Sequence, residues 1–214
     1  MGNAVDNTNT VTWPIGSFEI YAWTGMSGDT HGWNDSSFTR SAGWPELFIQ
    51  SGFVEDFESC AAGDTSGFFA AGDLNLWKPG VINALGGNKG YGTKVNGNVP
   101  GGVQEFLYFP RFIGFDTIAG AELRLTHDID LNTGDFAIIE FQGNGQWNNL
   151  GFWDPQNVVS TNWYNTGVAS SGSAWIGNVG QTTSIWPLSA WNFSAAPLIL
   201  RAQLKTVGGN KDGW

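Results

Sequence analysis

The chain has 214 residues, of which 31 are Gly, 12 are Trp and only 13% are charged. Its formal net charge of −10 repels polyanions, so nucleic acid and anionic membranes are not expected partners. No stretch approaches the ~18 apolar residues that a membrane-spanning helix needs, so no membrane insertion is expected. Abundant Gly and Trp with few charges favour many short strands joined by tight turns, which is an all-β fold.

Residues 1–52 are expected to form an N-terminal extension with a strand and a long loop. Its segment FEIYAW alternates as a half-buried strand does, which predicts a strand over residues 11–23. Residues 25–43 are rich in Gly, Ser, Asp and Thr, which predicts a long surface loop. Residues 47–57 are apolar enough to form a further strand.

Residues 121–142 hold the clearest strand pattern of the chain. Apolar and polar residues alternate in ELRLTHDIDL, residues 122–131, which predicts a strand with one buried face. A turn at residues 132–135 follows, and then FAIIEF, residues 136–141, is apolar on both faces, as expected in the middle of a sheet. We expect the two strands to pair as a hairpin at the centre of the fold. His127 lies in phase with the apolar residues, so we interpret it as a buried, hydrogen-bonded histidine and not as a general base.

A series of short motifs runs in a fixed order from residue 56 to the end of the sequence. They are Asp56-Phe57-Glu58, Trp77-Lys78-Pro79-Gly80, Tyr91-Gly92-Thr93-Lys94, Glu105-Phe106-Leu107-Tyr108-Phe109-Pro110, Gly143-Asn144-Gly145-Gln146-Trp147-Asn148-Asn149-Leu150-Gly151, Asn162-Trp163-Tyr164-Asn165, Ala174-Trp175-Ile176-Gly177 and Asp212-Gly213-Trp214. This order resembles the MAM-like, lectin-like jelly-roll domains of secreted peptidases and surface adhesins of gliding bacteria. The resemblance covers residues 53–214 and implies a jelly-roll (concanavalin-like) antiparallel β-sandwich that works outside the cell or at its surface. The Pro and Gly of residues 77–80 and the Tyr-Phe pair before Pro110 depart from the family pattern.

In that family a further strand follows the residues that match 212–214, so the resemblance implies a sandwich without its final strand. Such a sandwich leaves an open row of backbone donors and acceptors. The missing strand could follow in a longer chain, the segment near residues 18–23 could fold into the gap, or that segment could be donated to the next copy and build a fibre. The residues expected to make assembly contacts are Phe18, Ile20, Trp23 and Trp214.

The resemblance also implies a structural calcium ion. In MAM-like domains the acid of the first strand and acids near the last strand meet around a cation, and Glu58 and Asp212 hold the matching positions. From the carboxylate set Asp56, Glu58, Asp64, Asp73 and Asp212, we expect Glu58, Asp56, Asp73 and Asp212 to be ligands. The DIDLNTGD segment has the first oxygens of a calcium loop, but its Gly falls one place late, which favours a strand and turn.

Nine of the 12 Trp residues divide into two groups. Those at family positions, expected in the core or packed on turns, are Trp77, Trp147, Trp163 and Trp175, and those in loops, where exposure is expected, are Trp33, Trp44, Trp153, Trp186 and Trp191. An exposed Trp beside amides and carboxylates is typical of sugar binding, because the ring stacks on a pyranose while polar groups hold its hydroxyls. The expected ligand-binding residues are Trp147, Asn149, Trp153, Asp154 and Asn157. The alternative is that these residues pack the loops against each other or against a neighbouring copy.

No sequence pattern of a catalytic site is present. The chain lacks a G-x-S-x-G elbow, an H-E-x-x-H helix and a glycosidase carboxylate pair, so we do not expect an enzyme. The lone Cys60 excludes an intrachain disulfide framework. We therefore expect a non-catalytic extracellular adhesion or recognition domain that binds a glycan or a cell-surface protein. The alternatives are a subunit of an extracellular filament assembled by strand exchange and the accessory domain of a secreted hydrolase.

Overall fold

The computed structural model describes residues 16–23, 36–58, 67–81, 89–93, 97–114, 118–169, 172–188, 197–208 and 211–214. These residues form an all-β structure in which nearly all strand pairs are antiparallel. None of them belongs to a helix that is long and apolar enough to cross a membrane. The chain divides into two compact units, Met1–Pro45 and Glu46–Trp214, whereas the sequence placed the boundary after residue 52.

The first unit contains a two-stranded antiparallel sheet. Its strands are β1 (Gly16–Trp23) and β2 (Ser36–Gly43), paired from Gly16 opposite Gly43 to Trp23 opposite Ser36. β1 lies within the predicted strand, but β2 lies in a segment predicted to be a loop, and for these residues the loop prediction is wrong. The sequence of β2 is mostly polar and small, so it carries little strand signal of its own. It forms a strand because it pairs with β1 along its whole length.

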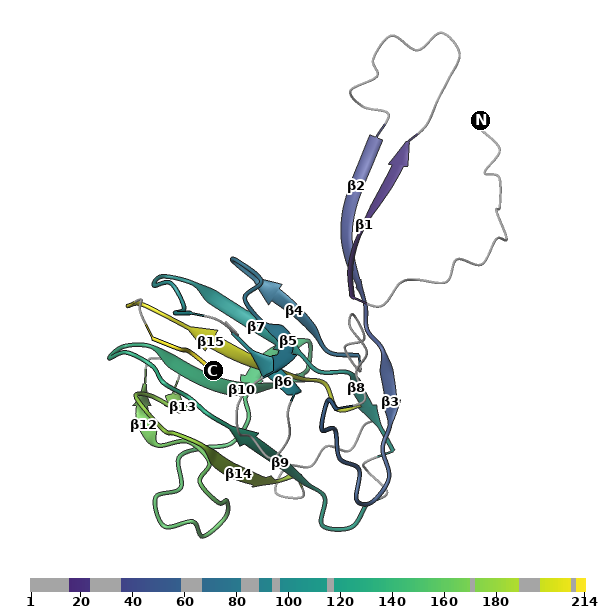
Figure 1. The fold of residues 1–214 in the computed structure, drawn as a ribbon. Coiled ribbons are helices and arrows are strands. Elements are labelled where there is room, and N and C mark those ends of the chain that lie inside the picture. The colour runs from purple at the N-terminus through teal and green to yellow at the C-terminus, as the bar shows by residue number, and fades with distance from the viewer. Residues whose placement is uncertain are drawn as a thin grey trace, which may run out of the picture. The chain divides into compact units, whose positions relative to one another are not determined.

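The second unit is built around a five-stranded antiparallel sheet of order β11-β10-β15-β7-β4 (Figure 1). Its strands are β11 (Gln146–Asn149), β10 (Phe136–Gly143), β15 (Leu200–Lys205), β7 (Gln104–Tyr108) and β4 (Phe69–Gly72). β10 lies between β11 and β15, which confirms that its continuous apolar run belongs inside a sheet. β10 turns into β11 through Asn144 and Gly145, whose φ angles of 52° and 74° suit the tight hairpin turn that Asn-Gly predicts.

The remaining strands of this unit pair two by two. β9 (Glu122–His127) pairs with β14 (Thr182–Pro187), β12 (Thr166–Ala169) with β13 (Gly172–Ala174), β5 (Lys78–Val81) with β6 (Lys89–Gly92), and β3 (Glu46–Phe48) with β8 (Arg111–Ile113). The first three pairs are antiparallel and the last is parallel. Figure 1 shows β9, β14, β12 and β13 on one side of the five-stranded sheet, so the unit is sandwich-like.

Residues 211–214 join two of these pairs. Gly213 exchanges two backbone hydrogen bonds of 2.9 and 3.0 Å with Asp130, which follows β9. Thr93, which follows β6, donates its N–H to the carbonyl oxygen of Trp214 at 2.7 Å. The C-terminal residues are therefore hydrogen-bonded both to the segment after β6 and to the segment after β9.

β9 and β10 do not form the predicted hairpin. β9 pairs with β14, whereas β10 pairs with β11 and β15, so the two strands belong to different sheets. The turn between them is present, with a 3.1 Å hydrogen bond from the N–H of Asp135 to the carbonyl of Asn132. The buried Asp135 carboxylate also accepts the N–H groups of Val207 and Gly208, directly after β15. These bonds hold the turn beside β15, and β10 therefore enters the five-stranded sheet.

The core between the two layers is rich in Trp. The side chains of Trp163, Trp175 and Trp186 are fully buried, with ring centroids 5.3 Å apart for Trp163 and Trp175 and 5.7 Å apart for Trp163 and Trp186. The predicted burial of Trp77, Trp163 and Trp175 is confirmed. The predicted exposure of Trp186 is wrong, because this residue lies on the inward face of β14 and not in a loop. Trp33 and Trp191 lie outside the described residues.

Candidate binding site on the five-stranded sheet

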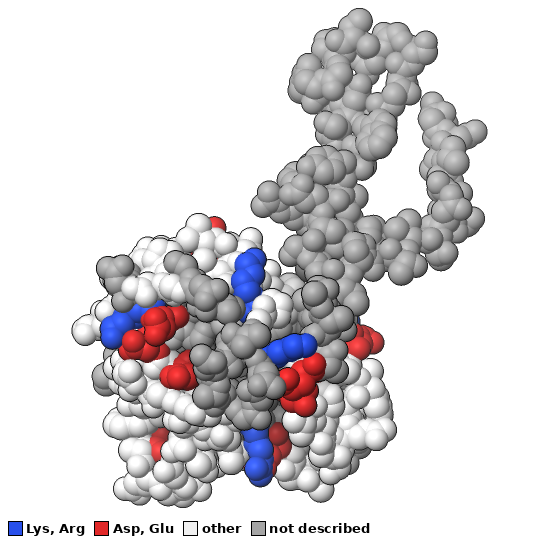
Figure 2. Space-filling view, viewed as in Figure 1, with Lys and Arg blue, Asp and Glu red and all other residues white. Residues whose placement is uncertain are grey.

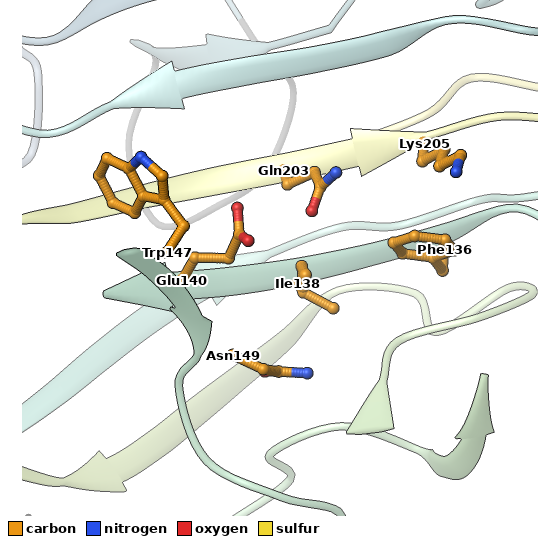
Figure 3. A pocket seen from close by; sticks show the side chains of 7 residues that line it. All are labelled: Phe136, Ile138, Glu140, Trp147, Asn149, Gln203 and Lys205. Carbon is orange, nitrogen blue, oxygen red and sulfur yellow. The ribbon is translucent and has the colours of Figure 1, made fainter. Parts of the chain in front are cut away.

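An open depression of about 350 Å³ lies on one face of the five-stranded sheet (Figure 3). Its lining comes from three adjacent strands and comprises Phe136, Ile138 and Glu140 of β10, Gln203 and Lys205 of β15, and Trp147 and Asn149 of β11. Ala137 and Ile139 point to the opposite face of β10, where they are fully buried. Phe136 and Ile138 are also largely buried, with 5% and 3% of their surface exposed, so the depression offers little of these two side chains to solvent. Phe136 pairs with Lys205 and Ile138 with Gln203, which sets an apolar strip beside a polar strip.

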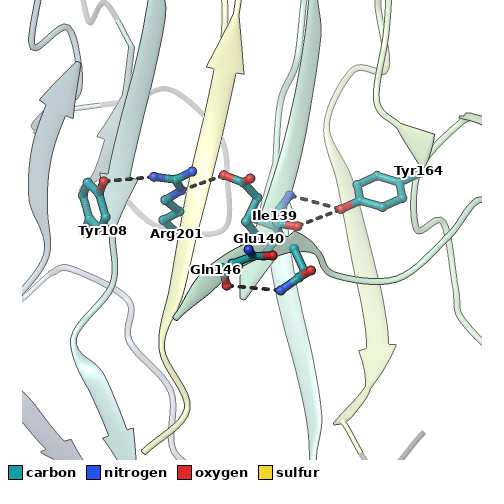
Figure 4. A network of polar contacts seen from close by, with 7 residues as sticks. Tyr108, Ile139, Glu140, Gln146, Tyr164 and Arg201 are labelled. Carbon is teal, nitrogen blue, oxygen red and sulfur yellow. Dashed lines mark hydrogen bonds and ion pairs between the residues drawn. The ribbon is translucent and has the colours of Figure 1, made fainter. Parts of the chain in front are cut away.

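Arg201 contacts two of the lining residues, Trp147 and Glu140, and Figure 4 shows its bonds to Glu140 and Tyr108. Its guanidinium carbon is 4.1 Å from the ring centroid of Phe106 and 4.2 Å from that of Trp147. Its Nε donates to Glu140 Oε2 at 2.6 Å, and a terminal nitrogen donates to the Tyr108 hydroxyl at 3.0 Å. The side chains of Arg201 and Glu140 are each 11% exposed, which shields the pair from water. Stacking thus holds the Trp147 ring in place, and the ion pair offsets the charge of Glu140.

Two polar side chains in the depression make no hydrogen bond or ion pair with the described residues. Gln203 is only 6% exposed, yet its side-chain amide makes no hydrogen bond to this part of the chain. Lys205 is exposed and makes no ion pair with a described carboxylate, and its ammonium lies 6.0 Å from the ring centroid of Phe136. Both residues lie on the same face of β15, two positions apart. An amide and an ammonium are therefore available to a ligand.

Asn149 has a different role, because its amide already has partners on both sides. Its Nδ2 donates to the carbonyl of Ser173 at 2.6 Å, and its Oδ1 lies 2.6 Å from the Tyr164 hydroxyl. These contacts tie β11 to β13 and to the Tyr164 segment. Asn149, a predicted ligand-binding residue, therefore shapes the depression more than it offers free polar atoms.

The other three predicted ligand-binding residues lie in the loop after β11. Trp153 is 42% exposed, as predicted. The Asp154 carboxylate accepts the N–H groups of Val159 at 2.6 Å and Ser160 at 2.9 Å, and hydrogen bonds from Ser160 and then Val159 lower the pKa of Asp154. Asn157 Oδ1 accepts a backbone N–H at 3.0 Å. The polar residues thus shape this loop, and the predicted set is divided between the loop and the depression.

The predicted calcium ligands of the first motif bind protein groups. One carboxylate oxygen of Asp56 accepts the N–H of Glu58 at 3.0 Å. The Glu58 carboxylate accepts the N–H of Lys89 at 2.7 Å, at the start of β6. Both carboxylates therefore organise the backbone close to them.

The remaining predicted calcium ligands lie on other segments. Asp73, directly after β4, accepts the N–H of Gln104 at 2.7 Å, and Asp212 is exposed in the C-terminal segment. Asp64 lies outside the described residues. Over the part of the chain that the structure describes, no group of three or more His, Cys, Asp or Glu side chains could hold a metal ion. Calcium binding stays a prediction.

The predicted assembly residues fall in both units. Phe18, Ile20 and Trp23 lie in β1, and their side chains are outside the described part of the structure. The Trp214 ring packs within its own unit, 5.4 Å from Trp77 between ring centroids. Trp214 therefore contributes to the core of the second unit.

His127 and Ser184 form a buried pair that resembles a catalytic dyad in residue type only. His127 Nε2 lies 2.8 Å from Ser184 Oγ, which donates its own proton to the Asn162 carbonyl at 2.6 Å. The His127 Nε2–H therefore donates to Ser184, and the serine proton is not available to a base. Burial lowers the pKa of His127 to about 4. The prediction of a buried, hydrogen-bonded histidine is confirmed.

Sequence reasoning missed Arg201, Gln203 and Lys205. They alternate with Leu200, Ala202 and Leu204 in β15, which is the pattern of a strand with one polar face. The pattern was visible, but it does not show that β10 and its apolar strip lie alongside.

Comparison with protein-family models, with curated proteins and with solved structures finds no match to the chain.

Proposed function

We propose that residues 46–214 form a non-catalytic extracellular recognition domain, a β-sandwich of jelly-roll type that binds a glycan in the depression on its five-stranded sheet. The observation that carries the proposal is the lining, in which the Trp147 ring and the edges of Phe136 and Ile138 lie with Gln203 and Lys205, whose amide and ammonium make no hydrogen bond or ion pair with the described residues. A sugar has the same duality, with apolar ring faces and polar edges. Small-molecule sites in general combine apolar walls with a few polar groups that fix orientation.

The rigidity of the site also favours binding. The Trp147 ring is held by Arg201, which is itself fixed by Glu140 and Tyr108. A ring that is already in place loses little conformational freedom when a ligand stacks on it or packs against its edge. The site is therefore already shaped before binding, which favours a sugar, since sugars bind most proteins with low affinity.

The test compares two Trp variants of the whole chain on an immobilised glycan panel and then by calorimetry on any glycan retained. Trp147→Ala should abolish retention, whereas Trp153→Ala, in the exposed loop after β11, should leave it unchanged. A panel that retains nothing, or a Trp147→Ala protein that binds as the parent does, contradicts glycan binding in the depression.

A second candidate function is contact with a cell-surface protein through the loop after β11. Phe152 and Trp153 are 46% and 42% exposed, and Val158 is 77% exposed, so apolar side chains gather within one short segment. In that case Trp153→Ala, and not Trp147→Ala, should weaken adhesion to cells.

Filament assembly by strand exchange has less support. In the C-terminal segment, Lys211 pairs with Val99 and Gly213 pairs with Asp130. The segment that carries Trp214 is thus already paired within its own unit.

A further inference from the structure

We propose that the glycan bound in the depression is anionic, and that Lys205 and Gln203 hold its carboxylate or sulfate group. This inference rests on the proposed function, because it specifies the ligand of the same site. The two sources of negative charge on a sugar, a uronate and a sulfate ester, present the same chemistry of anionic oxygens to an ammonium and an amide.

The charges of the lining support an anionic ligand. Its ionisable residues are Glu140 and Lys205. The Glu140 carboxylate is 2.6 Å from Arg201 Nε and only 11% exposed, so its charge is offset by a neighbour outside the lining. Lys205 has no such neighbour among the described residues. The ammonium of Lys205 is therefore the charge that a ligand meets.

Gln203 supplies the second, independent observation. Its side chain is buried, lines the depression and has no hydrogen-bond partner in the described part of the chain. Amides in such positions are almost always hydrogen-bonded, so this amide takes its partner from the depression, which is water in the free protein and a ligand group in the complex. Its NH₂ group can donate to an anionic oxygen, and its carbonyl can accept from a sugar hydroxyl.

The geometry allows both residues to hold one sugar unit. Gln203 and Lys205 are two positions apart on one face of β15, a separation of about 7 Å along a strand. Ile138 and Phe136 lie directly opposite them on β10. A pyranose lying in the depression would turn its charged edge to Lys205 and a neighbouring hydroxyl to Gln203.

The net charge of −10 does not prevent this binding. Over the described surface seen in Figure 2, acidic residues are spread among basic ones and do not gather in one field. At physiological ionic strength, charges more than about 8 Å apart are largely screened. The local ammonium therefore decides which charge the depression accepts, and the overall charge mainly slows association.

The test uses the full 214-residue chain and calorimetry with matched pairs of oligosaccharides. One pair is an oligogalacturonate and its carboxyl-reduced, neutral counterpart, and the other is a sulfated galactan oligomer and its desulfated form. At least one acidic member should bind about tenfold more tightly than its neutral counterpart, and this preference should weaken as salt is raised from 50 to 300 mM. The pair that shows the preference identifies the source of the charge.

Two variants locate the contact. Lys205→Gln should lower the affinity for the acidic oligosaccharide about tenfold and leave that for the neutral counterpart unchanged, and Gln203→Met should weaken binding of both. Lys78→Gln, which removes an exposed lysine from β5, is the matched control and should bind as the parent does. Equal or tighter binding of the neutral members, with no effect of Lys205→Gln, overturns the anionic ligand but leaves glycan recognition standing. Binding of no saccharide, acidic or neutral, overturns both.

Discussion

The hydroxyl of Tyr164 lies 3.1 Å from both the backbone nitrogen and the backbone oxygen of Ile139 (Figure 4). Ile139 is the point on β10 where one edge partner is replaced by another, since Ala137 pairs with Trp175 and the residues from Glu140 onward pair with β11. The carbonyl of Ile139 accepts the N–H of Leu150 at 2.7 Å, and the Tyr164 hydroxyl accepts the N–H of Ile139, which has no strand partner on this edge of β10 among the described residues. Burial raises the pKa of Tyr164, so the hydroxyl keeps its proton and can act as both donor and acceptor.

Tyr164→Phe should therefore cost more stability than the loss of one surface hydroxyl. The N–H of Ile139 and the Oδ1 of Asn149 would both lose their partner in the protein interior. A buried polar group without a partner costs about 1–3 kcal/mol, and we expect the free energy of unfolding to fall by about 2 kcal/mol in urea titrations. Tyr91→Phe is the control, because the Tyr91 hydroxyl is 3.5 Å from the Phe68 carbonyl and should matter less. If both variants lose the same free energy of unfolding, the contacts of the Tyr164 hydroxyl with Ile139 and Asn149 do not matter more than those of an ordinary hydroxyl.

His127 should make the fold sensitive to mild acid. Burial lowers the pKa of His127 from 6.5 to about 4, so between these values the unfolded chain binds more protons than the folded one. The stability contributed by the neutral imidazole is complete above pH 6.5 and is lost as the pH falls toward 4. Over the whole window the loss is roughly 3 kcal/mol.

The measurement is the free energy of unfolding at pH 7.5 and at pH 5, for the parent chain and for His127→Gln. Between these two pH values, the parent should lose about 2 kcal/mol more than the variant does, because Gln does not titrate. Thr126→Gln, on the exposed face of the same strand, should keep the pH dependence of the parent. If the parent and His127→Gln show the same slope, the imidazole is not the group responsible.

The strands and turns that local sequence determines could be predicted. The continuous apolar run of β10, the Asn144-Gly145 turn and the burial of Trp163 all follow from patterns within a few residues. The sheet that the chain enters after β9 does not follow from such a pattern. The choice between a hairpin and a crossing to the other sheet depends on the Asp135 carboxylate meeting the backbone at Val207, 72 residues away.

The depression was less predictable than the fold for a similar reason. Trp147 and Asn149 could be selected because aromatic and amide residues cluster after the turn, and both do line it. Gln203 and Lys205 are ordinary polar positions in their own strand. They form a site only because β15 pairs with β10, a relationship between segments about 65 residues apart that no local pattern encodes.

Glu105 also shows where local reasoning fails, because this carboxylate is fully buried on the core side of β7. Its Oε1 accepts the N–H of Leu74 at 2.6 Å, and its Oε2 accepts the N–H of Leu76 at 2.8 Å. In Glu105→Gln an NH₂ group would face one of these donors, so the free energy of unfolding should fall by about 2 kcal/mol. Glu122→Gln, which removes an exposed partner of Arg124, should change it by less than about 0.5 kcal/mol. A ranking in the opposite order would contradict an anchoring role for Glu105.

Asp154 should order the loop after β11 without contributing much to global stability. Hydrogen bonds from Ser160 and then Val159 lower the pKa of Asp154, so the ordered loop favours the carboxylate. The contribution of Asp154 is present above 3.8, the ordinary pKa of an aspartate side chain, and is lost as the pH falls below that value. In Asp154→Asn the amide hydrogens of Val159 and Ser160 should exchange several-fold faster at pH 6.5, while the midpoint of urea unfolding stays nearly constant. Asp128→Asn, at another exposed carboxylate, should leave both amides unaffected. Unchanged exchange at Val159 and Ser160 in Asp154→Asn would show that the Asp154 carboxylate does not order this loop.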